Sequence, residues 1–373
     1  MIAKRFGFTR NFLRERNTGL YCRLKKIPCA FKDRARACLL MDFPGSIAQR
    51  RFRWQSVCFA NGLGAMFRKN THWVGLILVL AFAGLLSACV TTSGIHTPPS
   101  IPPSRMLETR DLAEVSESAL DWSRQLGAEQ VLVVFDLDNT LLAMEQDLGS
   151  DQWYDWQKEL QAADRCDPQV VSDRLAVQGA LYAVNAMRLT QADGPAQVRK
   201  LQQQGLKVII LSSRGPDFRL QTLRELRRGG YRFDFSAMGP TGGYAEPFMP
   251  QGGSRPASYE DGVFLTAGQH KGEMLQALLL KTHTPRPAMV VIADDKPDNL
   301  QAVMDAFAGS TTSVQAFRYG REDDVVSTFD GEQAARQWQQ ARPALQQLQR
   351  LFGPDIFDLP QEVAADGCAE TVR

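Results

Sequence analysis

Residues 131–140 read Val-Leu-Val-Val-Phe-Asp-Leu-Asp-Asn-Thr, so that five apolar residues run directly into Asp136 and Asp138. A valine-rich run of this kind is typical of a strand that is buried on both faces of a parallel sheet. Ligands bind at the carboxyl ends of such strands, so both aspartates are expected at the mouth of a site. Asn139 and Thr140 suit the tight turn that follows. The alternative is a strand that merely ends in an Asp-rich turn, and the rest of the chain has to separate the two.

Two further apolar runs end in polar side chains. Residues 208–212, Val-Ile-Ile-Leu-Ser, predict a second strand that ends at Ser212. Residues 289–293, Met-Val-Val-Ile-Ala, predict a third strand that runs into Asp294 and Asp295. Three buried strands that end in polar residues favour a site over a turn.

Helical patterns separate these strands. Residues 195–205 predict a crossover helix, and residues 270–273, His-Lys-Gly-Glu, open another helix with Lys271 near its start. Alternating strands and helices predict an α/β fold with a doubly wound parallel sheet.

The order of these elements is DxDxT, a strand-end Ser, a Lys and a strand-end acidic pair, over about residues 131–303. In this order they resemble the haloacid dehalogenase superfamily of phosphotransfer enzymes. The resemblance implies that Asp136 attacks phosphorus and forms a phosphoaspartate. It also implies that Asp138 protonates the leaving group and then activates the water that hydrolyses the intermediate.

The acidic residues predict a magnesium site. Asp136, Asp294 and Asp295 offer the hard oxygen ligands that suit Mg²⁺, and the resemblance adds the backbone carbonyl of Asp138. Asp298 is either a further ligand or a helix cap. The chain has four histidines, and no pair of them has the spacing of a zinc motif.

The substrate phosphate needs cations, because a carboxylate that attacks a phosphate ester must overcome like-charge repulsion. Lys271 would contact one phosphate oxygen, and Ser212 would donate a hydrogen bond to another. Asn139 is also predicted to bind the phosphate. Alternatively, Lys271 is a solvated surface residue. Ser212 could instead cap a helix, or Ser213 could be the residue that binds the phosphate. Arg214 either binds the phosphate or pairs with an acidic neighbour.

These residues favour a phosphatase acting on a small phosphorylated substrate. Asp138 argues against dehalogenases, which lack the second aspartate, and the single hydrophobic stretch argues against transporting ATPases; a phosphomutase stays open. Among known groups the chain looks closest to bacterial exported phosphatase-like members of the superfamily, including the lipoprotein acid phosphatases. Those phosphatases carry Glu where this chain has Asn139 and differ in their later motifs, so their nucleotide preference is not expected here, and an uncharacterised branch is the alternative. The main rival is a non-catalytic periplasmic lipoprotein that binds a phosphorylated ligand or supports the envelope.

The expected catalytic domain, residues 106–373, contains an insert after the first motif. Residues 143–194 look helical and resemble the superfamily's small cap, which would select the substrate. A helix capped by Ser150 is expected first, then a helical stretch over residues 168–189. Trp153 and Trp156 form either an aromatic wall for a ligand or the core of this cap.

Two later segments have less specific patterns. Residues 239–255 are rich in Gly and Pro and predict a long loop or a hairpin. The Gln-rich residues 332–352 predict a helix that packs on the body of the protein and is interrupted at Pro343.

The N-terminal part predicts export. Residues 66–88 combine a basic start, a short apolar run and small residues, as in a secretory signal. Cys89 directly after Leu-Ser-Ala resembles a bacterial lipobox, so the mature chain would be lipid-anchored there, with residues 89–105 as a Pro-rich tether. Val90 in place of aspartate favours the outer membrane, facing the periplasm. The alternative is a short uncleaved anchor.

Residues 1–65 carry 14 basic and 3 acidic residues. We interpret them as a gene-model artefact that precedes a start at Met66, or otherwise as an unstructured basic extension. Residues 89–373 then carry 27 basic and 38 acidic residues, a net charge of −11. Such an acidic body is unsuited to nucleic acid, so no nucleic-acid partner is expected.

The mature chain keeps three cysteines, Cys89, Cys166 and Cys368. With Cys89 acylated, Cys166 and Cys368 are able to form a disulfide in an oxidising periplasm. Two free thiols are the alternative.

The export hypothesis predicts the chemical form of the mature protein. Mass spectrometry of the cell-derived protein should find Cys89 as an acylated first residue and no peptide from before Met66. Peptides from residues 1–65 would contradict the internal start.

Overall fold

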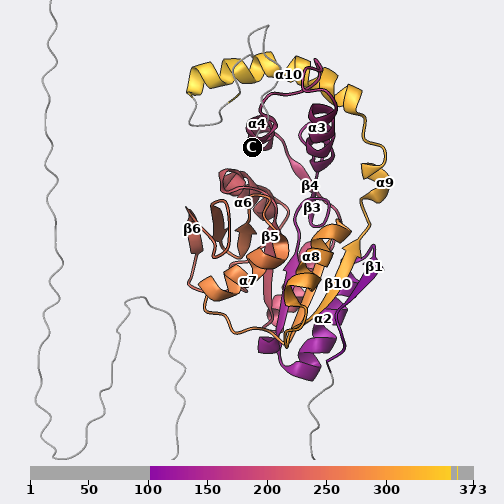
Figure 1. The fold of residues 1–373 in the computed structure, drawn as a ribbon, viewed down its shortest axis with the longest axis vertical. Helices are drawn as coiled ribbons and strands as arrows, with labels where there is room; N and C mark the ends of the chain where they lie inside the picture. The colour runs from indigo at the N-terminus through magenta and orange to yellow at the C-terminus, as the bar shows by residue number, and fades with distance from the viewer. Residues whose placement is uncertain (1–100, 354–358, 360–373) are drawn as a thin grey trace, which may run out of the picture. The chain divides into compact units, whose positions relative to one another are not determined.

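The computed structural model describes residues 101–353 and Leu359 (Figure 1). The stretch 1–65, the signal 66–88, Cys89 with most of its tether, and Cys368 lie outside the described residues, and the predictions made for them stay predictions. Within the described part, no helix combines the length and apolarity needed to cross a bilayer.

A mostly parallel sheet with helices on both faces forms the centre of the described chain, which confirms the predicted α/β class. In spatial order the eight strands are β1 (Arg105–Thr109), β10 (Ser313–Tyr319), β9 (Met289–Asp294), β2 (Val131–Phe135), β5 (Lys207–Ser212), β8 (Val263–Leu265), β7 (Ala257–Glu260) and β6 (Gly243–Phe248). The first six strands in this order are all parallel to one another.

The predicted parallel sheet is extended at one edge by a hairpin, where β7 and β6 run antiparallel to their neighbours. A parallel pair needs a crossover of a dozen or more residues. Only Asp261 and Gly262 join β7 to β8, and both have positive φ angles, 49° and 82°, as a tight hairpin turn requires. The Gly- and Pro-rich residues 239–255 therefore contribute β6 of an edge hairpin and the loop that follows it.

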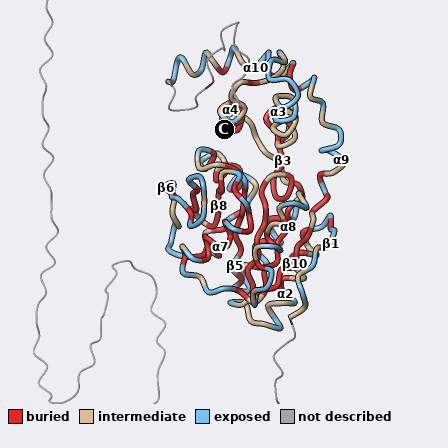
Figure 2. The backbone as a smooth tube through the Cα atoms, in the orientation of Figure 1, coloured by how far each residue is buried: buried red, intermediate tan, exposed pale blue. Residues whose placement is uncertain are grey.

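The central strands are apolar on both faces because each face has its own core. In β2, Val131, Val133 and Phe135 belong to one cluster, and Leu132 and Val134 belong to the cluster on the opposite face. The strands β5 and β9 alternate in the same way, and all of their residues except Lys207 are buried. Figure 2 shows buried backbone concentrated in the sheet. This double burial explains the uninterrupted apolar runs in the sequence.

Helices cover each face of the sheet. One face packs against α2 (Leu112–Leu126), α5 (Gly194–Gln203) and α6 (Arg219–Arg228), and the other packs against α7 (Lys271–Lys281) and α8 (Pro297–Phe307). Short helical turns are η1 (Ala128–Gln130), η2 (Pro216–Phe218) and α9 (Asp323–Val326). The predicted crossover helix is α5, which starts with Pro195 in its first turn and is followed by Gly205 at φ 80°.

An insert of two helices and a small sheet separates β2 from α5. It comprises β3 (Leu142–Met144), α3 (Asp151–Ala163), α4 (Arg174–Val184) and β4 (Met187–Leu189), and β3 pairs antiparallel with β4. Ser150 caps α3 as predicted, because its hydroxyl accepts a hydrogen bond from the Trp153 N–H at 3.1 Å. The helix expected over residues 168–189 is shorter, since its last residues pair with β3.

The insert has a core of its own, which it shares with the C-terminal helix α10 (Gly331–Phe352). The buried members of this insert core are Leu148, Trp153, Val171, Val177, Ala180, Leu181, Ala334, Leu345 and Leu359. Trp153 is fully buried, and Trp156 packs against Phe329 with ring centroids 6.0 Å apart. Trp153 therefore lies inside the insert core and Trp156 packs against it, which favours the core role over a ligand wall.

Helix α10 differs from its prediction in two respects. It packs on α3 and the rest of the insert, away from the sheet (Figure 1), and it continues through Pro343 without a break. Proline removes one helical hydrogen bond, but Pro343 is exposed and the helix is held by buried residues on both sides, Ala334 and Leu345.

The shared insert core predicts a specific loss of stability. Replacing Leu181, which is 2% exposed, by Ala should lower the free energy of unfolding by about 2–5 kcal/mol in urea denaturation. Leu220→Ala is the matched control, because that leucine is 66% exposed and should tolerate the change. Equal stability of the two variants would contradict a packed insert.

Candidate functional site

The carboxyl ends of three neighbouring strands carry the predicted site residues. Strand β2 lies between β9 and β5, and all three are parallel. Asp136 directly follows β2, Asp294 ends β9 and Ser212 ends β5. The chain leaves β2 for β5 on one side and later returns to β9 on the other, so the strand order reverses here. In open α/β sheets, ligands bind at such a switch point.

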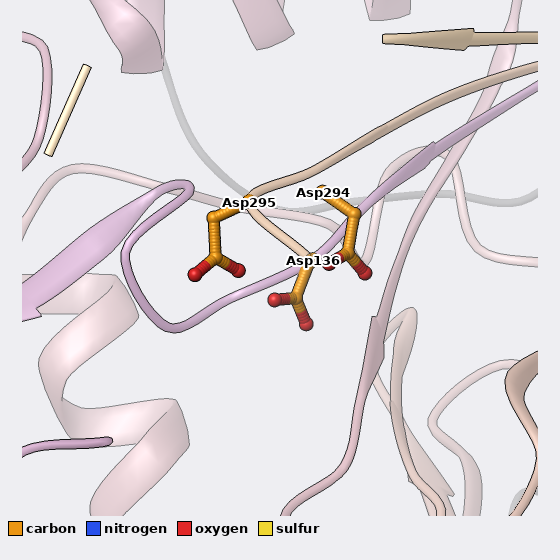
Figure 3. A group of neighbouring side chains, drawn as sticks. All are labelled: Asp136, Asp294 and Asp295. Carbon is orange, nitrogen blue, oxygen red and sulfur yellow. The ribbon is translucent and has the colours of Figure 1, made fainter. Parts of the chain in front are cut away.

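Three carboxylates converge at this edge (Figure 3). Asp136, Asp294 and Asp295 each offer an oxygen within 4.8 Å of the others. Asp294 is fully buried, Asp136 is almost so, and Asp295 is half-buried. The predicted acidic cluster is therefore brought together, whereas Asp298 is an exposed residue in the first turn of α8, outside the cluster.

Lys271 is a buried residue between two of these carboxylates. Its Nζ lies 2.6 Å from Asp136 Oδ1 and 2.5 Å from Asp294 Oδ2, and the residue is 2% exposed. The alternative of a solvated surface lysine is thus wrong. Lys271 begins α7, where a Cβ on Gly272 would come within 2.2 Å of the Ala302 carbonyl oxygen. Glycine is required here for the close approach of α7 and α8 that places Lys271 over the strand ends.

Burial and crowding perturb the protonation of this cluster. Burial, reinforced by Asp294, raises the pKa of Asp136 to about 7, although Lys271 opposes the shift. Burial also raises the pKa of Asp295 well above its ordinary value, with Asp136 and Asp294 adding to the effect. Burial opposes the charge on Lys271, but Asp136 and Asp294 outweigh it and raise its pKa. A single ammonium is therefore too little positive charge for three carboxylates.

The donor set fits a small hard cation. Asp294 is held in place because its Oδ1 accepts hydrogen bonds from the Lys296 N–H and the Asn299 side chain, each at 2.9 Å. Among residues 101–353, no side chain or backbone donor contacts Asp136 Oδ2 or the Asp295 carboxylate. These are oxygen ligands of the type that Mg²⁺ binds. Sequence reasoning missed the supporting role of Asn299, which has no signal beyond its place after the acidic pair.

Asp138 forms a separate ion pair with Arg214. The Arg214 Nε and Nη2 lie 2.9 and 2.7 Å from Asp138 Oδ2 and Oδ1, a two-pronged arrangement. Arg214 Nη1 donates to Thr222 at 2.9 Å, and the Tyr182 ring covers the guanidinium at 4.0 Å. Of the two roles considered for Arg214, the structure therefore shows pairing with an acidic neighbour.

Asn139 and Ser212 are both buried near the strand ends. Asn139 has φ 57°, a left-handed conformation that asparagine tolerates, so it shapes the predicted turn. Ser212 Oγ accepts a hydrogen bond from the Arg214 N–H at 3.1 Å. This contact orders the loop after β5, and the assignment of both residues to phosphate binding stays a prediction.

The insert reaches the site through Lys296, which follows the acidic pair. Its Nζ lies 2.7 Å from Asp151 Oδ2 and 2.9 Å from Asp155 Oδ2, both on α3. Burial raises the pKa of Asp151, while Lys296 opposes the shift. Sequence reasoning missed this link, because nothing in the local pattern pairs residues that lie about 140 positions apart.

Cys166 lies on the insert, after α3, and is disulfide-bonded. Its expected partner, Cys368, lies beyond the described residues, so their pairing stays a prediction.

The buried lysine predicts a strong effect on stability. Lys271→Met should lower the free energy of unfolding by about 3–5 kcal/mol in chelator, because it leaves Asp136 and Asp294 buried without a cation. Lys200→Met, at an exposed position in the last turn of α5, is the control and should leave stability unchanged. A Lys271→Met protein as stable as the wild type would contradict this account.

Comparisons with known proteins give one match. A search of curated proteins and a search of solved structures found none. The model of a family described as "Protein of unknown function (DUF2608)" matches residues 108–349, from β1 through the sheet and the insert into α10. Because the match covers well over half of the sequence, the chain belongs to the DUF2608 family.

Proposed function

We propose that this protein is a Mg²⁺-dependent phosphomonoester hydrolase that works through a phosphoaspartate on Asp136. The observation that carries the proposal is the buried Lys271 ammonium between Asp136 and Asp294 at a topological switch point. A carboxylate that attacks a phosphate ester needs fixed positive charge beside it, and Lys271 supplies such a charge 2.6 Å from Asp136.

The reaction has two steps in this proposal. The free Oδ2 of Asp136 attacks phosphorus, and the bond from phosphorus to the ester oxygen breaks. Asp138, which is protonated at this stage of the proposed cycle, gives its proton to the departing alkoxide and then carries the negative charge that pairs with Arg214. Asp138 then takes a proton from water, the water oxygen attacks phosphorus, and the bond to Asp136 breaks. The products are an alcohol and inorganic phosphate, and both aspartates return to their starting state.

The three clustered carboxylates would hold Mg²⁺, with the Asp138 carbonyl as a further expected ligand. When bound, the cation would neutralise negative charge on the transferring phosphate. Asp294 is fixed for this purpose by Asn299 and the Lys296 N–H. Lys271, and by expectation Ser212 and Asn139, would orient the phosphate oxygens.

Two further expectations belong to the proposal. The order DxDxT, Ser, Lys and acidic pair supports a haloacid dehalogenase-like core, and the insert after the first motif would serve as its cap. The lipobox-like Cys89 supports a lipid-anchored protein at the outer membrane, facing the periplasm.

The rival function is a non-catalytic lipoprotein that binds a phosphorylated ligand. A binding site gains nothing from an acid such as Asp138 held beside a second carboxylate. Crowding three carboxylates is also costly without a further cation beside Lys271. These features favour the hydrolase.

The test is turnover of a panel of phosphate esters with Mg²⁺ or with chelator. Asp136→Asn should lower kcat by at least about 10³-fold, because it removes the attacking carboxylate. Asp305→Asn, at an exposed position on α8, is the matched control and should keep full activity. The enzyme proposal is wrong if no ester is hydrolysed in a Mg²⁺-dependent reaction, or if Asp136→Asn leaves that reaction unchanged.

A further inference from the structure

Arg214 occupies an unusual position at the junction of the sheet and the insert. It follows β5 in the chain, yet its guanidinium contacts Tyr182 of α4 and Met187 of β4, both in the insert. The Arg214 side chain is 4% exposed and that of its partner Asp138 is 15% exposed. The ion pair is thus largely shielded from water, and its geometry is fixed by packing.

We infer that Arg214 is a positioning residue for Asp138, and that the insert sets the orientation of this acid through Tyr182 and Arg214. The inference rests on the proposed phosphomonoesterase function, in which Asp138 exchanges a proton with the leaving group.

The two-pronged contact is the first argument. Asp138 lies in the turn between β2 and β3, where its carboxylate would otherwise rotate about two side-chain bonds. Two parallel hydrogen bonds from a planar guanidinium fix both carboxylate oxygens in one plane. A lysine at this position would offer a point charge and would leave that rotation free.

The surroundings of the guanidinium are the second argument. The Tyr182 ring covers one face of the guanidinium, and Phe218 packs edge-on against that ring with centroids 5.5 Å apart. The remaining contacts are Thr222 Oγ1 at 2.9 Å and Met187 Sδ at 3.2 Å. Arg214 is poorly placed to bind the substrate phosphate itself, because Nε and Nη2 already donate to Asp138 and the Tyr182 ring covers one face of the guanidinium.

The consequence is a link between the insert and the chemistry. Any shift of α4 moves the Tyr182 ring, the guanidinium beneath it and hence the Asp138 carboxylate. The insert would then affect catalysis as well as substrate selection, because its position determines whether the Asp138 carboxyl points toward the leaving oxygen.

The test uses a series of phenyl phosphates that differ in the acidity of the leaving phenol. A protonating acid matters most for poor leaving groups and little for 4-nitrophenolate. The ratio kcat/KM reports the steps up to formation of the phosphoaspartate and excludes its later hydrolysis, which is the same for every ester. Arg214→Met should lower kcat/KM about 10²-fold on the poorest leaving group and less than about threefold on 4-nitrophenyl phosphate. Asp138→Asn should show the same pattern, and the double variant should lose nothing more.

Matched variants separate positioning from general damage. Tyr182→Leu should shift the leaving-group dependence in the same direction as Arg214→Met. Tyr154→Leu is the control, because Tyr154 also lies in the insert and covers an arginine, Arg174, at 4.9 Å, outside the strand-end site. Arg214→Lys should recover less than half of the turnover that Arg214→Met loses. Melting curves identify misfolded variants, and Tyr182→Leu carries the test where Arg214→Met does not fold.

The outcomes are distinguishable. A wild-type protein that hydrolyses none of the esters overturns the proposed function and this inference with it. An active wild type whose Arg214→Met variant loses kcat/KM equally on all esters overturns the inference alone. The inference is also overturned if the losses caused by Arg214→Met and Asp138→Asn add up in the double variant.

Discussion

The site depends on one buried ammonium. Lys271 lies between Asp136 and Asp294 with almost no access to water, so removing it leaves two carboxylates uncompensated in the interior. This constraint fixes the relative positions of β2, β9 and α7, and it requires the glycine at position 272 that lets α7 approach α8. It also leaves the cluster short of positive charge, since a third carboxylate, Asp295, lies at the same edge.

A second ion pair divides the site into parts with different surroundings. The cluster of Asp136 with Lys271 is formed by the sheet and its helices, whereas the pair of Asp138 with Arg214 is covered by the insert through Tyr182. Two carboxylates only two residues apart are thereby held by different cations. Distinct surroundings are how proteins give neighbouring carboxylates distinct roles, which fits the proposed division between attack on phosphorus and proton exchange.

The sequence predicted what local patterns encode. Buried parallel strands appear as continuous apolar runs, so β2, β5 and β9 were recognisable and their carboxyl ends located Asp136, Ser212 and Asp294. The pairing partner of Arg214, the link from Lys296 to α3, and the packing of α10 on the insert were not predictable. Each depends on contacts between segments far apart in the chain, for which periodicity carries no signal. The Gly- and Pro-rich residues 239–255 predict either a loop or a hairpin for a related reason, since Gly and Pro mark a change of chain direction but not which segments pair afterwards.

The packing of α10 changes how the insert can act. A cap joined to its core by two chain connections alone is free to move as a lid. This insert is also bound to the helix that follows β10 and α9, because Ala334 and Leu345 complete its core. It contacts the site loop through Lys296 and the acid through Tyr182 and Arg214. In the proposed hydrolase, movement of the insert would therefore change the charges that surround the strand ends, and substrate choice and chemistry would not belong to separate parts of the chain. The family match extends from β1 into α10 and so includes the sheet, the insert and most of the helix that packs on it.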